Sequence, residues 1–142
     1  MAYKVQPFYN ISSPVGAGQP NKPDDVALVQ YLLVKVASRT TGKWTPPATP
    51  LVVNGTYSKN LSDWILSYQK VTAVPDDGIV HPQVNPHWSV KLYGTIVSLN
   101  GSFRNNFGAA RHDNIMAEPD FPATLRTPLS AANAKPDMGT TA

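Results

Sequence analysis

The sequence predicts a small, mainly α-helical protein: a three-helix bundle with short extended links and long non-regular arms at both ends. Three stretches of the chain repeat apolar residues at the spacing of an α-helix. The two ends are instead rich in proline, glycine and small polar residues, without any such period. We therefore divide the chain into an extended N-terminal arm (1–20), a helical domain (21–107) and a low-complexity, extended C-terminal tail (108–142).

The N-terminal arm contains Pro7, Pro14 and Pro20, which forbid a long helix. It also carries several apolar side chains that a free tail would not contain, namely Tyr3, Val5, Phe8, Tyr9 and Ile11. We expect this arm to pack on the core or on a neighbouring subunit.

The first predicted helix, residues 21–37, is the element around which the chain is organised. Asn21 is its expected cap, and Pro23 suits its first turn. Its core stripe consists of Val26, Val29, Gln30 and Leu33. The opposite side is also apolar, through Leu28, Tyr31 and Leu32. Because a helix that is apolar all round is buried or faces a partner, we expect this second side to be an interface.

Two more helices are predicted after a proline-rich loop around Trp44. That tryptophan fits an interface role and a core-capping role equally well. The second helix is capped by Ser58, and its core stripe consists of Leu61, Trp64, Ile65 and Tyr68. The third is expected to start at residues 85–86, and its apolar residues are Leu92, Ile96, Leu99 and Phe103. Gly101 is expected to end or kink this helix.

Two glycine turns connect these helices, one at Gly55 and one at Asp77-Gly78. Both glycines are expected to have positive φ, because the chain reverses there. Gln30 and Gln69 lie on the apolar stripes of the first and second helices. Since a buried amide offers both donors and acceptors, we expect each glutamine to bond the backbone of one turn.

Four segments carry motifs in a fixed order: 15–33, Val53-Asn54-Gly55-Thr56-Tyr57, Trp64-Ile65 with Tyr68-Gln69, and Asp77-Gly78-Ile79-Val80 followed by a helix with Ile96, Leu99 and Asn100. In this order they resemble the peptidoglycan-binding domains, in the form seen in modules linked to phage lysins and type VI secretion effectors. The resemblance covers roughly residues 15–100 and implies a small three-helix fold. Asn54, Ser58 and His81 depart from the family's pattern.

The composition and charge limit the function. The chain has 142 residues, enough for one domain, and 15% are charged against ~25% in an average soluble domain. The net charge of +3 is not gathered in a basic run, so nucleic-acid binding is not expected. There is no cysteine, no apolar run that could span a membrane and no Sec signal. We expect cytoplasmic synthesis, and another route to any extracellular, virion-associated or machine-associated location.

No constellation for catalysis is found, so we expect no enzyme, no cofactor and no metal. The histidines, His81, His87 and His112, are interpreted as exposed loop residues. A zinc site from His81, His87 and Asp76 or Asp77 lacks ligands at helical spacing. The sequence contains no nucleophile elbow or P-loop and no glutamate within the helical domain.

The expected function is that of a structural subunit, which uses this fold for protein–protein interaction and self-association in a phage particle, a secretion machine or a filament. A low-charge surface suits a protein that a partner covers. The tail is expected to lie extended across another subunit, or across the first helix of the same chain in a monomer. The interface residues would be Leu28, Tyr31 and Leu32 on the helix and Phe121, Leu125 and Leu129 in the tail.

The alternative function is a stand-alone murein-binding module, with peptidoglycan as its ligand. Glycan recognition would use an exposed aromatic platform with polar side chains around it. Trp44, Tyr57 and Trp88 are the aromatic residues nearest loops and turns, and so are the candidates for this platform.

Overall fold

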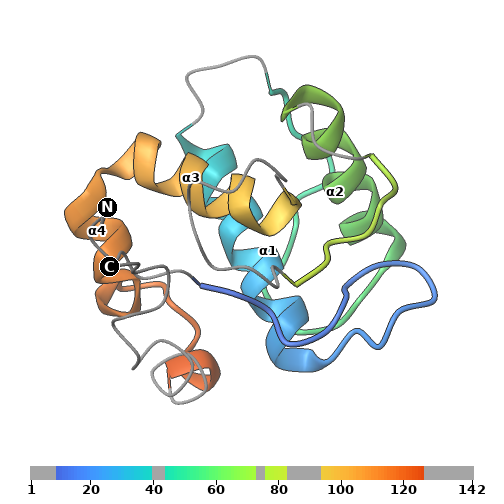
Figure 1. The fold of residues 1–142 in the computed structure, drawn as a ribbon, viewed down its shortest axis with the longest axis horizontal. Helices are drawn as coiled ribbons and strands as arrows, with labels where there is room; N and C mark the ends of the chain where they lie inside the picture. The colour runs from blue at the N-terminus through green and yellow to red at the C-terminus, as the bar shows by residue number, and fades with distance from the viewer. Residues whose placement is uncertain (1–8, 40–43, 73–75, 83–93, 127–142) are drawn as a thin grey trace, which may run out of the picture.

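The computed structural model describes residues 9–39, 44–72, 76–82 and 94–126, and in these residues the protein is mainly helical, as expected (Figure 1). The elements in order are α1 (Pro23–Ser38), α2 (Lys59–Thr72), α3 (Thr95–Phe107), α4 (Ala109–Asp113) and the 3-10 turns η1 (Ile115–Ala117) and η2 (Ala123–Leu125). One isolated antiparallel bridge, Val15 to Val80, joins the N-terminal segment to the turn after α2.

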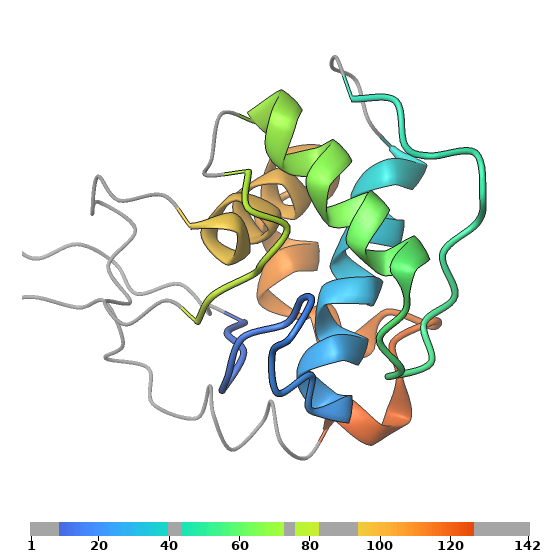
Figure 2. The same cartoon turned by 90° about the vertical axis from the view of Figure 1, so that its right-hand side faces the viewer.

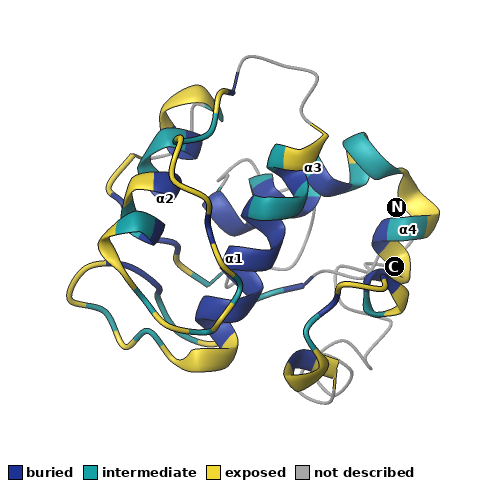
Figure 3. Cartoon of the chain, turned by 180° about the vertical axis from the view of Figure 1, so that it is seen from behind, coloured by how far each residue is buried: buried dark blue, intermediate teal, exposed yellow. Residues whose placement is uncertain are grey.

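Helix α1 runs through the middle of the molecule, with α2, α3 and the C-terminal turns around it (Figures 1 and 2). Ten of its 16 residues are buried, on both of its apolar sides (Figure 3). Burying one large apolar side chain is worth about 1.5–3 kcal/mol, so α1 is the principal source of hydrophobic stabilisation. The second side, with Leu28, Tyr31 and Leu32, is therefore buried within this chain, so it is not available as an interface to another subunit.

The start of α1 differs from the prediction that Asn21 is its cap. Lys22 holds the cap position without a side-chain hydrogen bond, and Asn21 has φ 48°. Its side chain instead closes the preceding loop: Oδ1 accepts from Gly16 N and Nδ2 donates to Gly16 O, both at 2.8 Å. Asparagine tolerates this left-handed backbone better than most residues, which explains its place here.

The N-terminal segment packs on the core, as expected, through Tyr9, Ile11 and Val15. A buried carboxylate in the first turn of α1 fixes it there. Asp25 accepts hydrogen bonds of 2.8–3.1 Å from the backbone N–H and hydroxyl groups of Ser12 and Ser13. These bonds satisfy the buried charge, which would otherwise be costly.

Helix α2 and its core stripe have the predicted form. The hydroxyl of Ser58 accepts from the backbone N–H of Leu61 at 3.3 Å, so Ser58 is the cap. The four predicted stripe residues of α2 are all buried: Leu61, Trp64, Ile65 and Tyr68.

Both glycine turns are held by glutamine side chains, and this prediction is confirmed. Gly55 and Gly78 have φ of 76° and 74°. Oε1 of Gln30 accepts from the N–H of Asn54 and Gly55 at 2.9 and 2.8 Å, and Oε1 of Gln69 accepts from Gly78 N–H at 2.9 Å. Each amide also donates to a carbonyl of its turn, so both glutamines, 1% exposed, have their polar groups satisfied.

Helix α3 begins later than predicted. It starts at Thr95 after Gly94, which is extended at φ −83° and ψ 165°, so the predicted start at residues 85–86 is wrong for this helix. Residues 85–86 and Leu92 lie outside the described part. Gly101 does not end α3, because the buried Leu99 and Phe103 on either side outweigh a glycine penalty of about 1 kcal/mol.

Residues 108–126 are not an extended tail. They form α4, η1 and η2, and their apolar residues Ile115, Phe121 and Leu125 enter the same core as α1. Prolines 119 and 122 bar a long helix but allow these short turns, and the three anchors offset the entropy of ordering them. The ring of Phe121 meets that of Tyr31 edge-on at 5.1 Å, so this segment covers the second side of α1 in cis. Leu129 and the rest of the tail lie outside the described residues.

Candidate functional site

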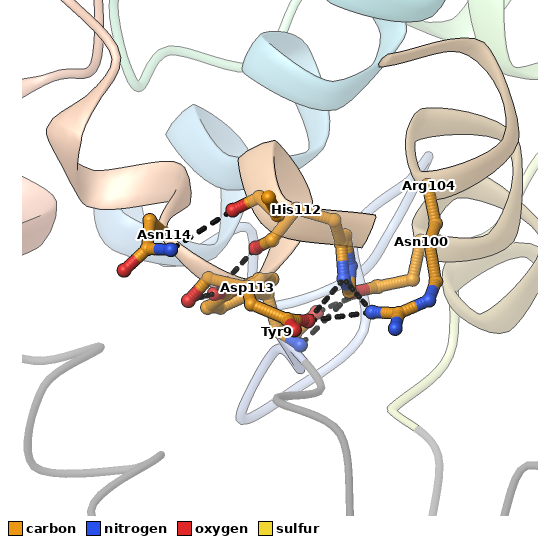
Figure 4. Close-up of polar contacts among 7 residues, drawn as sticks. Tyr9, Asn100, Arg104, His112, Asp113 and Asn114 are labelled. Carbon is orange, nitrogen blue, oxygen red and sulfur yellow. Dashed lines mark hydrogen bonds and ion pairs between the residues drawn. The ribbon is translucent and has the colours of Figure 1, made fainter. Parts of the chain in front are cut away.

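A buried polar cluster lies where the N-terminal segment, α3 and α4 meet (Figure 4). We call its five members, Tyr9, Asn100, Arg104, His112 and Asp113, the Asn100 cluster. Its centre is inaccessible to solvent, because Asn100 and His112 are both 0% exposed. Arg104 and Asp113 pair with each other at its partly exposed rim.

Asn100 joins two segments that are distant in sequence. Its Oδ1 accepts from the backbone N–H of Tyr9 and from Nε2 of His112, both at 3.0 Å. Its Nδ2 donates to the carbonyls of Tyr9 and Ile96 at 3.0 and 2.9 Å. Since a backbone N–H can only donate and a carbonyl can only accept, the orientation of this amide is fixed.

The amide orientation also fixes the protonation of His112. Because Oδ1 of Asn100 accepts, Nε2 of His112 carries the proton, and Nδ1 is left to accept from Nη1 of Arg104 at 3.3 Å. Burial, and then the charge of Arg104, lower the pKa of His112 to about 4. His112 is therefore a neutral, buried imidazole at neutral pH, and the interpretation of it as an exposed loop residue is wrong.

The side chain of Tyr9 also contacts α4, through its hydroxyl group and its ring. Its hydroxyl donates to the carbonyl of His112 at 2.7 Å, with the carbonyl of Asp113 at 3.1 Å. Its ring meets the imidazole edge-on at 5.1 Å. Burial raises the pKa of Tyr9 to about 12, so the phenol stays protonated as a donor.

The side chains of the Asn100 cluster hold the N-terminal segment, α3 and α4 together. A neutral imidazole can act as a general base only if a substrate reaches it, and this ring has no exposed surface. The amide and phenol bond backbone groups of the segments that they join. In the described residues no three His, Asp or Glu side chains are placed to hold a metal ion. His81 lies 3.4 Å from Asp77, and His87 lies outside the described part.

A second polar network fastens the C-terminal segment to α1. Tyr31 donates to Asp120 at 2.8 Å, and Lys35 pairs with Asp120 at 3.1 Å and with Glu118 at 3.7 Å. Arg111 binds Glu118 through both Nε and Nη2, and this bidentate bond lowers the pKa of Glu118. Asp120 directly precedes Phe121, so the bond from Tyr31 to Asp120 reinforces the contact between the rings of Tyr31 and Phe121.

A proline-rich extended segment, residues 45–53, follows the surface of α2, and we call it the uncharged ledge. Its carbonyls at Thr49 and Pro50 accept from Trp64 Nε1 at 2.9 Å and Asn60 Nδ2 at 3.0 Å. None of its nine residues is charged. Val52, near its end, is 63% exposed. The chain thus presents a fixed, uncharged surface with an exposed apolar side chain.

The aromatic residues expected to bind glycan do not form a platform in the described residues. Trp44 is 6% exposed, donates to Ser67 Oγ at 2.8 Å and packs edge-on against Trp64 and Tyr68, so its core-capping role is the correct one. Tyr57 is half-buried against the core. Trp88 lies outside the described residues.

The Asn100 cluster was not found from the sequence because its partners are far apart. Tyr9 and Asn100 are separated by 91 positions, and no local pattern connects them. Asn100 ends the last of the motifs that carry the family resemblance, and this position is the signal in the sequence that points to it. His112 lies on a helix of five residues, too short for a periodic pattern.

The fold and these clusters define a mainly α domain whose first and last described segments, 9–22 and 108–126, are hydrogen-bonded to its helices. Comparison with protein-family models, with curated proteins and with solved structures finds no match for this chain. Among the described residues, none of the helices has the length and apolar character needed to cross a membrane.

Proposed function

We propose that this chain is a non-enzymatic assembly subunit, which uses a peptidoglycan-binding-like fold for protein–protein interaction with further copies of itself. Support for the fold comes from the two glutamine-held turns. They fall within the segments that carry the resemblance, at Gly55 and at Gly78. The bridge between Val15 and Val80 also joins the first of these segments to the last.

The observation that carries the assembly role is the uncharged ledge. The cores of protein–protein interfaces are depleted of charged residues, and this segment has none. Because Trp64 and Asn60 hold its backbone, little conformational entropy is lost when a partner binds. The exposed Val52 would then be the apolar anchor of the contact.

The Asn100 cluster supports a non-enzymatic role. Its buried amide, imidazole and phenol are engaged in attaching Tyr9 and α4 to α3. A catalytic group must reach its substrate, whereas these groups lie inside the protein.

Murein binding is the alternative, and Tyr57 is the observation in its favour. This half-exposed tyrosine follows the turn that exposes Asn54 and Thr56, so an aromatic face and polar side chains are neighbours in sequence. Stacking on Tyr57 would be the central contact to a sugar.

Light scattering after size exclusion, together with a pull-down on purified cell-wall sacculi, tests both functions. We expect a mass above that of the 15.4 kDa monomer, and no sedimentation with sacculi. Val52→Lys should reduce the mass towards the monomer, because it places a charge in the interface. Val71→Lys is the matched control, since Val71 is also an exposed valine (41%) but lies on α2. A monomeric wild-type protein would contradict the proposed assembly. Murein binding would be supported if this monomer sediments with sacculi and the Tyr57→Ala variant does not.

A further inference from the structure

We propose that residues 9–11 and α4 form an acid-sensitive latch on α3, in which uptake of a proton by His112 releases both segments from Asn100. This inference concerns the regulation of the fold and does not depend on the proposed assembly function. It rests on the geometry of the Asn100 cluster (Figure 4).

One side chain holds both segments of the latch. Oδ1 of Asn100 accepts simultaneously from Tyr9 N–H and from His112 Nε2–H. The Tyr9 hydroxyl in turn donates to the carbonyl of His112, so each segment also contacts the other. Loss of the His112 contact therefore removes support from Tyr9 as well, and the two segments should open together.

In the closed latch, the surroundings of His112 disfavour a second proton on its imidazole ring. Nε2 already carries the proton that Asn100 receives, so a new proton must go to Nδ1. Nδ1 faces the guanidinium of Arg104 at 3.3 Å, and two cations would then oppose each other. The ring is 0% exposed, so water cannot screen that repulsion.

Among the described residues, the other groups around the imidazole offset the charge only in part. From α4, the Asp113 carboxylate lies 3.8 Å from Nδ1, but it is already paired with Arg104. From the N-terminal segment, the Tyr9 phenol is neutral, since burial raises its pKa to about 12. The nearest ring on α3 is that of Phe103, which is apolar, at 5.9 Å. Protonation is therefore coupled to opening, which brings the imidazole into water.

Opening would expose an apolar surface that neutral pH keeps covered. Tyr9 and Ile11 would leave the core, and Phe103 on α3 would lose the ring of His112 that packs against it. The released imidazole regains its ordinary pKa of about 6.5, against about 4 in the closed latch. The equilibrium constant for opening should then rise roughly 15- to 30-fold when the pH falls from 7.5 to 5.0.

Hydrogen–deuterium exchange measures this constant directly. The hydrogen-bonded amides of Tyr9, His112 and Asn114 are followed at pH 7.5 and 5.0, with correction for the intrinsic pH dependence of exchange. We expect the equilibrium constant for their opening to be about 15- to 30-fold higher at pH 5.0, and we expect these amides to exchange faster than those of α2 at both pH values. Exchange at the same rate as α2 would mean that only global unfolding releases the segments, and would overturn the proposal.

Two variants isolate the histidine. His112→Gln removes the titrating group, so its latch amides should show no acid-induced increase, whereas His81→Gln, in an exposed loop, should retain the wild-type response. An equal acid response in His112→Gln and wild type would contradict the proposal. If His112→Gln does not fold, an NMR titration of the wild-type imidazole decides the question. A His112 ring that titrates near pH 6.5 while the Tyr9 signals stay unchanged would show that the closed latch accepts the proton.

Discussion

The side-chain oxygen of Gln69 accepts a 2.9 Å hydrogen bond from the backbone N–H of Gly78, and so holds the turn after α2 against the last turns of that helix. The Nε2 group of the same side chain donates to the carbonyl of Ile79 at 3.0 Å and to the hydroxyl of Thr95 at 2.8 Å. Gln69 therefore links α2, its following turn and the start of α3. Gln30 makes the equivalent bonds to the turn at Gly55, closer to solvent.

Replacing Gln69 with leucine should destabilise the protein by about 1–3 kcal/mol, because the N–H of Gly78 would stay buried without its partner. Gln30→Leu should cost less, since Thr56 and Asn54 beside it are exposed and water can replace the lost bonds. Urea unfolding measures both values. Gln19→Leu is the control, because the amide of Gln19 makes only a long, exposed bond of 3.4 Å. Equal stability of all three variants would contradict the structural role of the two turns.

Alanine in place of Gly55, Gly78 and Gly101 should give effects of opposite sign. Gly55 and Gly78 have positive φ, where a side chain costs about 1–2 kcal/mol. Gly55→Ala should be the worse of the two, because its new Cβ would lie 3.1 Å from the carbonyl oxygen of Pro23. Gly101→Ala should stabilise α3 by about 0.5–1 kcal/mol, since the new Cβ meets nothing within 4 Å. Thermal unfolding distinguishes these outcomes, and stabilisation at Gly55 would refute the turn geometry.

Local patterns predicted the elements that local interactions determine. The stripe of α2 and its Ser58 cap follow directly from helical spacing, and the positive φ of Gly55 follows from its turn. The glutamine bonds could be predicted because a buried amide within a helical stripe needs partners, and a nearby turn supplies them.

Long-range packing determined the features that the sequence did not predict. Phe121 and Leu125 have no helical or strand period, so the sequence predicts an extended tail for this segment. Their burial depends on the second side of α1, which lies about ninety positions earlier, as the Tyr31–Asp120 bond illustrates with a separation of 89. The apolar side of α1 did predict that something covers it. The covering segment proved to belong to the same chain.

Alkaline pH should weaken the fold through its buried phenols. The folded pKa of Tyr9 is about 12, above the ordinary value of 10, so the unfolded chain loses this proton first. Stability is therefore fully present below pH 10 and falls as the pH rises towards 12, by at most about 1.4 kcal/mol per pH unit for this proton. Burial also raises the pKa of Tyr31 and Tyr68, which add to the slope.

The variant Tyr9→Phe separates the contribution of this phenol. At pH 8 it should be less stable by about 1 kcal/mol, through loss of the hydrogen bond to the carbonyl of His112. Between pH 10 and 11.5 its stability should fall less steeply than that of the wild type. Urea unfolding at several pH values gives both slopes, and parallel slopes would show that Tyr9 does not titrate late.

The last prediction concerns the segment from α4 to η2, which the structure makes part of the core. Phe121→Ala should destabilise the whole protein by about 3–5 kcal/mol, because it removes a buried ring that packs against Tyr31. Thr124→Ala, at an exposed position of η2, is the matched control and should have little effect.

Truncation after Phe107 provides the stronger test of this segment, because it uncovers the apolar second side of α1. It also removes Asp120, which accepts from Tyr31, and His112, which bonds Asn100. We therefore expect the shortened chain to lose cooperative unfolding, and to bind a hydrophobic dye that the complete chain does not bind. A truncated chain with an unchanged, cooperative transition would show that residues 1–107 fold alone and that the C-terminal segment is an accessory strap.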